Sequence, residues 1–350
     1  MQETKPPGPT AWEWTNSTRS ALTDFLQQKG LVDGSITTKA IGDGHSNLTY
    51  LVSDGERRMI VRRPPPPPLP KGAHDVLREA LFLGALEGTS VPVPTLLATA
   101  QTGEVIDFPF YVMSVVDGPV VTTRTPAPLD TPSRRLEIGE SLVDTLAELH
   151  SVDWRSRGLS RAGRPEGFNE RHFRRMRRLI ADADDLLPPE FRRIEAWLAA
   201  TVPVESGASI VHNDFRLGNV VLAPEGRGRV VGVLDWELTT IGDPLFDLGY
   251  FLASVPVAGE PLTPTEELGV ALLEEGYPTR QELTDRYEAR TGADLTHLPW
   301  YTTLALWKLA VLYEYGRRRA ATGGGDDYYS DPALVTAFLD AAQRAAEGTA

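Results

Sequence analysis

The chain has 350 residues, of which 41% are hydrophobic and 24% charged, and it contains no cysteine. This length is sufficient for two lobes with cores of their own. The lack of cysteine excludes disulfides and thiolate metal sites and fits a reducing compartment. The net charge of −13 argues against nucleic acid as the main partner. Because neither a signal peptide nor an apolar run of membrane-spanning length is present, we expect a cytoplasmic protein that does not bind membranes.

The first part of the chain, 1–117, is predicted to form a small β-rich lobe after a loose N-terminal tail. Short alternating runs separated by Gly and Asp are typical of antiparallel strands. A run of five prolines ends the third strand, because proline cannot donate to a sheet. The expected elements are a helix over 18–28, strands over 37–41, 47–52 and 58–62, a helix over 75–86 and a strand over 108–116.

The second part, 118–350, is predicted to be mainly helical, because apolar residues recur there with the helical period. The expected helices cover 136–150, 170–181, 188–200, 265–275, 280–290, 300–319 and 333–346, with short strands at 210–211, 220–222 and 229–234. The fold class is therefore α+β, with a small antiparallel β lobe followed by a larger helical lobe.

The stretch 210–221, IVHNDFRLGNVV, places polar residues between two apolar runs. Phosphoryl transfer from ATP needs a carboxylate that orients the attacking hydroxyl, and an amide oxygen and a second carboxylate that hold magnesium. In the kinase catalytic loop the first carboxylate precedes the amide by five residues, which is the spacing of Asp214 and Asn219. The next apolar run ends at Asp235 and supplies the second carboxylate. An alternative, a hydrolytic metal site that includes His212, lacks the usual ligand spacing.

A helix is predicted to begin at Asp243, which has the features of an N-cap and is followed by a proline at the first helical position. Asp247 is a carboxylate on the largely apolar helix that follows. Because a buried carboxylate needs hydrogen-bond partners, we expect Asp247 to brace the catalytic loop.

The segments HNDFRLGN and LDWELTTIGDPLFDLGY resemble those of the aminoglycoside phosphotransferase (choline kinase-like) superfamily, whose fold is bilobal and protein-kinase-like. The resemblance is closest to the kinase domain linked to acyl-CoA dehydrogenases. It implies an ATP- and Mg²⁺-dependent kinase in which Asp214 is the catalytic base and Asn219 and Asp235 bind magnesium. His212 and Asp243 would brace the loop.

Asn213 stands where the family usually has glycine, and asparagine tolerates unusual backbone angles better than most residues. We therefore expect the loop to keep its shape. Trp307-Lys308 and Arg317–Arg319 lie on late helices that could approach the substrate site, but we interpret them as helix-end charges suited to the helix dipole.

The β-rich lobe is expected to bind the nucleotide. Kinases pair a basic residue at a strand end with a helix glutamate, and Arg62 and Glu79 are predicted to form this pair. Arg63 is the alternative, because the strand register is uncertain by one residue, and two unrelated surface charges would be a simpler explanation. Arginine replaces the usual lysine here, but it can still bind phosphate through two bonds.

Two further segments are predicted to contact the nucleotide. The loop 41–47, IGDGHSN, stands where kinases have a glycine-rich lid, so Ser46 and Asn47 are expected near the phosphates, although a plain hairpin turn would fit as well. The segment YVMSVVDG matches the kinase hinge, where main-chain groups of Ser114 and Val116 would bind adenine.

The substrate class is inferred from residues 155–178, which contain nine arginines and two glutamates. This segment is either a solvated helix face or, at the position of the family's substrate-binding insertion, a site for an anion such as the phosphates of coenzyme A. With the resemblance, it favours a hydroxyacyl-CoA of the 4-hydroxy type. An aminoglycoside or other antibiotic phosphotransferase and a catalytically silent pseudokinase are the alternatives. The joint presence of Asp214, Asn219 and Asp235 argues against the pseudokinase.

Overall fold

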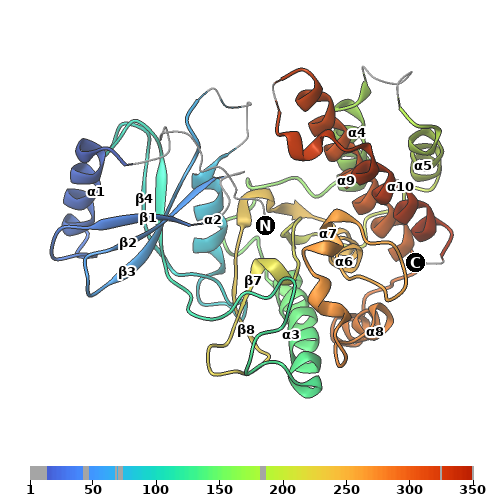
Figure 1. The fold of residues 1–350 in the computed structure, drawn as a ribbon, viewed down its shortest axis with the longest axis horizontal. Coiled ribbons are helices and arrows are strands. Elements are labelled where there is room, and N and C mark those ends of the chain that lie inside the picture. Colours follow the sequence, from blue (N-terminus) through green and yellow to red (C-terminus); the bar gives the residue numbers. More distant parts are fainter. Residues whose placement is uncertain are drawn as a thin grey trace, which may run out of the picture. The chain divides into compact units, whose positions relative to one another are not determined.

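The computed structural model describes residues 14–41, 47–67, 69, 74–181, 187–323 and 325–348. The chain divides into two compact units, one formed by Met1–Gly88 and Val93–Val116 and the other by Thr89–Pro92 and Asp117–Ala350. In Figure 1 the first unit contains the blue and cyan strands, and the second contains most of the helices. Within the described ranges, no helix combines the length and the hydropathy that crossing a membrane requires.

The first unit is built on a five-stranded antiparallel sheet with the order β1-β2-β3-β5-β4. Strict alternation of buried and half-buried residues in β2 explains why this segment forms a strand. The elements of the first unit are α1 (Asn16–Gln28), β1 (Thr37–Ile41), β2 (Leu48–Ser53), β3 (Arg58–Arg63), α2 (Val76–Leu86), β4 (Leu96–Ala100) and β5 (Phe110–Ser114).

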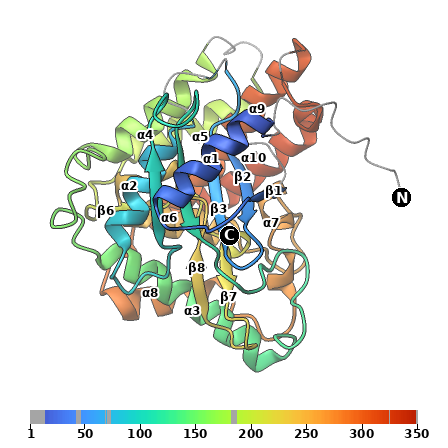
Figure 2. The same cartoon turned by 90° about the vertical axis from the view of Figure 1, so that its left-hand side faces the viewer.

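The two helices of this unit cover opposite faces of its sheet, as Figure 2 shows from the side of α1. Phe25 of α1 belongs to the same buried cluster as Val61 of β3, and its ring lies 5.4 Å from that of Phe110 in β5. The next residue of β3, Arg62, points to the other face and bonds to Glu79 of α2. The pleat of one strand therefore separates a hydrophobic core from a charged pair.

The second unit consists of helices around two short ladders, β6–β9 and β7–β8, both antiparallel. α6 packs tightly against α9, since a Cβ added at Gly249 would lie 2.8 Å from the backbone of Thr302. The elements are α3 (Pro132–Ser151), α4 (Phe168–Arg178), α5 (Pro189–Ala200), β6 (Ser209–Val211), η2 (Leu217–Asn219), β7 (Val220–Leu222), β8 (Val230–Val233), η3 (Trp236–Leu238), β9 (Thr240–Gly242), α6 (Pro244–Ala253), α7 (Pro264–Glu267), η4 (Val270–Leu273), α8 (Arg280–Thr291), α9 (Leu298–Ala321), η5 (Asp327–Ser330) and α10 (Pro332–Ala346).

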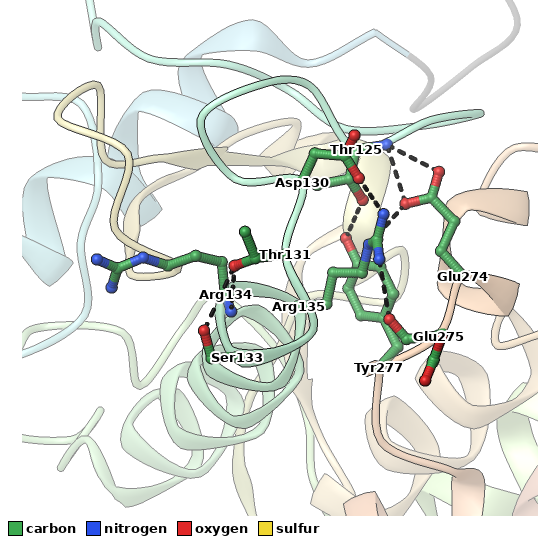
Figure 3. A network of polar contacts seen from close by, with 9 residues as sticks. All are labelled: Thr125, Asp130, Thr131, Ser133, Arg134, Arg135, Glu274, Glu275 and Tyr277. Atoms are coloured by element: carbon green, nitrogen blue, oxygen red, sulfur yellow. Dashed lines mark hydrogen bonds and ion pairs between the residues drawn. The ribbon is translucent and has the colours of Figure 1, made fainter.

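The segment that leads into α3 is fastened to the segment before α8 by the polar network of Figure 3. Arg135 of α3 donates to the carboxylate of Glu274 at 2.9 Å and to the main-chain oxygen of Glu275 at 2.9 Å, and it also pairs with Asp130. The buried hydroxyl of Thr125 lies 2.8 Å from the hydroxyl of Tyr277. These bonds join parts of the chain that are about 140 residues apart in sequence.

The sequence prediction of a continuous helix over 265–275 is wrong. The capping box of Thr263 and Glu266 does begin a helix there, but α7 ends at Glu267 and a separate 3₁₀ turn follows after Gly269. The N–H of Ala271 donates outside the segment, to the main-chain oxygen of Thr122 at 3.1 Å. A tertiary bond thus replaces a helical one, and glycine favours the break.

Two strands were missed by sequence reasoning. β4 reads LLATA and lacks an alternating pattern, with only its last residue buried, so its pairing with β5 rather than its own sequence defines it as a strand. β9 has only three residues, too few for a period to be seen, and it forms by pairing with β6.

Candidate functional site

Asp214 lies in the loop between β6 and β7, and both of its carboxylate oxygens accept hydrogen bonds. The amide nitrogen of Asn219 donates to Oδ2 at 2.7 Å and to the main-chain oxygen of Asp214 at 2.8 Å. The hydroxyl of Tyr250 in α6 donates to Oδ1 at 2.6 Å, and Arg216 Nε lies 3.5 Å from the same oxygen. The side chain of Asp214 is 18% exposed, so solvent reaches a carboxylate whose orientation is fixed.

Asn213 has a left-handed backbone with φ of +66°. Its side-chain amide donates to the main-chain oxygen of Leu238 at 2.8 Å. The left-handed region is where an asparagine replaces glycine at low cost, so the expectation that this loop tolerates Asn213 is confirmed.

Asp247 is fully buried in α6 and holds the loop from below. Its Oδ2 accepts from the N–H of His212 at 2.5 Å, and its Oδ1 accepts from the N–H of Asn213 at 2.6 Å. His150 Nε2 lies 3.4 Å from Oδ2. The prediction that Asp247 braces the catalytic loop by hydrogen bonds is confirmed.

His212 connects the catalytic loop to the segment that carries Asp235. Its Nδ1 accepts from the N–H of Asp214 at 3.3 Å, so Nε2 carries the proton that is donated to the main-chain oxygen of Leu234 at 2.9 Å. The N–H of Leu234 in turn donates to the main-chain oxygen of Asn219 at 2.8 Å. Asp235 follows directly, with a left-handed φ of +65°.

These contacts join the segments of Asn219 and Asp235, the two residues that the sequence predicts to bind magnesium. The amide nitrogen of Asn219 is used by Asp214, which leaves its amide oxygen available as an acceptor, and the main chain of Asn219 is bonded to the residue before Asp235. Carboxylate and amide oxygens are ligands that Mg²⁺ prefers, and Mg²⁺ takes few protein ligands because it keeps waters and substrate phosphates. The described residues contain no group of three acidic or imidazole side chains that would hold a metal by itself. The donor set fits magnesium in company with phosphates.

Asp243 is fully buried and collects donors from several segments. It caps α6 through the N–H of Leu245 at 3.0 Å and accepts from Ser206 at 2.5 and 2.8 Å. The hydroxyl of Tyr301 donates at 2.6 Å, and the amide of Asn169 lies 3.4 Å away. Of the two carboxylates on this turn, Asp247 is the one bonded to the loop backbone, whereas Asp243 joins α4, α6 and α9.

In the first unit, Arg62 Nε lies 3.0 Å from Glu79 Oε2, and both side chains are buried. Arg63, the alternative, points to the other face, where its guanidinium stacks on the ring of Phe108 at 4.4 Å and donates to Tyr50. Glu79 also accepts from the hydroxyl of Tyr111 at 3.0 Å. The register of β3 therefore gives Arg62 to the ion pair.

The other predicted nucleotide contacts lie in the same unit or outside the described residues. The amide of Asn47 donates to Glu79, so its side chain belongs to the buried network. Ser46 lies outside the described residues, with the rest of 42–46. The N–H of Ser114 donates to the main-chain oxygen of Thr95 at 2.9 Å. Val116 is half-buried just beyond β5.

The arginine-rich segment forms a loop followed by α4, whose buried side is apolar. Arg174 pairs with Glu170 at 2.5 Å, and Arg177 pairs with Glu195 at 2.5 Å. By contrast, Arg175 and Arg178 have no carboxylate within ion-pair distance among the residues that the structure describes. The segment therefore combines paired arginines with arginines that have charge to offer.

Sequence reasoning missed Tyr250 and gave Lys308 the wrong role. Lys308 lies in the middle of α9 and is only 5% exposed, so it is no helix-end charge. The available signal was a single lysine inside the apolar run ALWKLAV. Tyr250 carried no signal, because aromatic residues on an apolar helix are usually part of a core.

Comparison with known proteins decides the family: residues 37–283 match the model of the phosphotransferase enzyme family. The chain belongs to this family. This phosphotransferase-family chain is also homologous to the kinase-like region of acyl-CoA dehydrogenase family member 10 of Mus musculus. The two are 30% identical over 312 residues, which make up 87% of this chain and 29% of the mouse protein. The chain thus spans less than a third of that relative.

Solved structures of phosphotransferases have the same fold. A Ralstonia eutropha protein provisionally assigned as an aminoglycoside phosphotransferase is 28% identical, with a TM-score of 0.75 over 94% of this chain and 95% of that one. A thermostable mutant of aminoglycoside phosphotransferase APH(4)-Ia, in a ternary complex with AMP-PNP and hygromycin B, is 15% identical, with a TM-score of 0.60 over 94% of this chain and 100% of that one. The predicted α+β protein-kinase-like fold is confirmed.

Proposed function

We propose that this phosphotransferase-family chain transfers the γ-phosphate of ATP to a hydroxyl group of a small molecule. The observation that carries the proposal is the arrangement of Asp214, whose carboxylate is partly exposed and is held by Asn219 on one oxygen and by Tyr250 on the other. Each carboxylate oxygen has a second lone pair, so a substrate hydroxyl can donate to Asp214 without displacing either partner.

In the proposed reaction Asp214 orients the hydroxyl and accepts its proton late, as the oxygen–phosphorus bond forms and the bond to ADP breaks. Asn219 and Asp235 would hold Mg²⁺, which neutralises charge on the phosphates when bound. Arg62, held by Glu79, would bind phosphate oxygens of the nucleotide. The carbonyl of Ser114 and the N–H of Val116 would bind adenine, because the N–H of Ser114 already has a partner. In support of a nucleotide cofactor, APH(4)-Ia has been solved with AMP-PNP.

The test is ADP release from Mg-ATP without an acceptor, combined with calorimetric binding of Mg-ATP. We expect D214A to bind Mg-ATP as tightly as the unaltered chain and to release ADP at least about a hundredfold more slowly. The matched control is D340A, at an exposed position of α10. If the unaltered chain binds no Mg-ATP, the kinase proposal is wrong. If it binds Mg-ATP without releasing ADP, it is the pseudokinase.

For the acceptor we propose a hydroxyacyl-CoA, with the phosphates of coenzyme A bound by arginines of 155–178. Support comes from Arg175 and Arg178, for which the described residues offer no carboxylate. The relationship to an acyl-CoA dehydrogenase family member points the same way. The antibiotic alternative has its support in the complex of APH(4)-Ia with hygromycin B.

A thermal-shift panel with Mg-ATP separates the two acceptors. Coenzyme A thioesters are expected to raise the melting temperature and kanamycin-like amines to leave it unchanged. The response should be reduced in R175M and kept in R174M, because Arg174 on the same helix is already paired with Glu170. Stabilisation by aminoglycosides alone would overturn the coenzyme A proposal.

A further inference from the structure

Lys308 is a buried cation behind the catalytic loop. Its ammonium donates to the main-chain oxygen of Asn213 at 3.3 Å. It also lies over two aromatic rings of α6, 4.9 Å from the centre of Tyr250 and 5.3 Å from that of Phe246. Cation–π contacts of this kind stabilise an ammonium that has lost its water.

This position is unfavourable for a lysine unless its charge is used. Burial lowers the pKa of Lys308 to about 8, although the negative charges of Asp214 and Asp247 act to raise it. No carboxylate lies within ion-pair distance of Lys308 in the described parts of the chain. A methionine would cover the same two rings without the cost of burying a charge. The charge therefore acts on the two carboxylates from a distance.

Tyr250 links this cation to Asp214 by a second route. The ring that receives Lys308 on its face carries the hydroxyl that donates to Asp214 Oδ1 at 2.6 Å. Burial, together with the charge of Asp214, raises the pKa of the Tyr250 phenol well above its ordinary value. The phenol therefore stays a hydrogen-bond donor at neutral pH.

The backbone of Asn213 is thus held on both sides. The N–H of Asn213 donates to Asp247 of α6, and its carbonyl accepts from Lys308 of α9. Asparagine reaches the left-handed region at low cost but adopts other conformations as well, so this conformation needs support from outside the loop to be the only one. The grip of α6 and α9 supplies that support one residue before Asp214.

We propose that Lys308 and Tyr250 are positioning residues for Asp214. Lys308 fixes the left-handed peptide of Asn213 through its carbonyl, and Tyr250, with Lys308 over its ring, fixes carboxylate oxygen Oδ1. The proposal rests on the proposed phosphoryl transfer for its effect on turnover, but the grip on the loop exists without it.

The test uses the full chain with three single variants and one double variant. K308M removes the charge and keeps the length, Y250F removes one oxygen atom, and Y250F/K308M combines the two. K29M is the matched control, because Lys29 also lies over an aromatic ring, 5.6 Å from the centre of Phe25, but in the first unit. Melting temperatures establish that each variant is folded, and Y250F carries the test should K308M not fold.

Two measurements are made on each variant. The first is the rate of ADP release from Mg-ATP, split into kcat and KM. K308M and Y250F should each lower kcat about tenfold, which corresponds to about 1.4 kcal/mol of lost transition-state stabilisation. Both should leave KM within about twofold of the unaltered value, and K29M should change neither. The double variant should lose less than the product of the two single losses, because both residues act through one carboxylate.

The second measurement is hydrogen exchange of the peptide that covers 210–220. The N–H groups of His212 and Asn213 are bonded to Asp247, so a loosened loop exchanges faster in K308M and not in K29M. Unchanged exchange in both K308M and Y250F would overturn the positioning role. An unchanged kcat in both variants would overturn it as well. If KM alone rose in K308M, Lys308 would bind nucleotide instead of positioning Asp214. If the unaltered chain releases no ADP, the proposed function fails, while exchange still decides the positioning role.

Discussion

The substitution D247N tests how the catalytic loop is supported. Asp247 is fully buried and accepts the N–H groups of His212 and Asn213 at 2.5 and 2.6 Å. Asparagine keeps one oxygen and places an NH₂ group against the other N–H. One bond to a charged acceptor is lost, about 1.5–3 kcal/mol, and a buried donor is left without a partner, about 1–3 kcal/mol.

The free energy of unfolding should therefore fall by at least about 2.5 kcal/mol, the sum of the two lower values. In a unit of this size each kcal/mol lowers the melting temperature by about 2–4 °C, so a decrease of at least about 5 °C is expected. The assay is urea unfolding supported by calorimetry. D340N, the same change at an exposed position of α10, should stay within about 0.5 kcal/mol. A D247N variant as stable as D340N would refute the view that these two bonds hold the loop.

Three further predictions concern other parts of the structure. N213V should lower the free energy of unfolding by about 1–3 kcal/mol, since a β-branched residue resists the left-handed region; N213G should stay within about 1 kcal/mol, and equal urea midpoints for the two would contradict this. Burial acts to raise the pKa of Glu274, but bonds that include the one from Arg135 outweigh it and leave the pKa below its ordinary value. The contribution of the Glu274 carboxylate to the free energy of unfolding is therefore complete above the pKa of Glu274 in the unfolded chain, and it is lost as pH falls through the pKa in the folded chain. E274Q should be less stable than the unaltered chain at neutral pH. A difference in unfolding free energy that did not shrink in acid would contradict this direction. R62K should weaken Mg-ATP binding about tenfold in calorimetry, because lysine cannot bind phosphate bidentately; R58K, at the exposed start of the same strand, is the control, and equal affinities would exclude Arg62 from the nucleotide site.

Sequence patterns located much of the fold, because most elements show a local period. The strand over 37–41 and the helix over 75–86 agree with β1 and α2 to within a residue. The spacing of Asp214 and Asn219 was also readable, since the two lie in one loop and bond across five positions. A local signal of this kind survives in any single sequence.

What could not be predicted depends on contacts between distant segments. Lys308 reaches Asn213 across 95 positions, and Tyr250 reaches Asp214 across 36. No hydrophobic periodicity or residue spacing in the sequence predicts such pairs, because they arise from the packing of α6 against α9. The same reason explains β4, whose partner strand determines it.

The buried carboxylate of Asp243 has a consequence for how this fold can change. Asn169, in the first turn of α4, bonds within the cluster of Asp243 and Tyr301 and also donates to the main-chain oxygen of Pro203 at 3.3 Å. The arginine-bearing helix is thus attached near its beginning through Asn169, whose main-chain N–H also donates to Glu205 at 3.3 Å, and these bonds are separate from the hydrogen bonds to Asp214. Under the proposed acceptor site, a helix with a different charged face but the same Asn169 and the same buried side would change acceptor preference and leave the geometry of the catalytic loop unchanged.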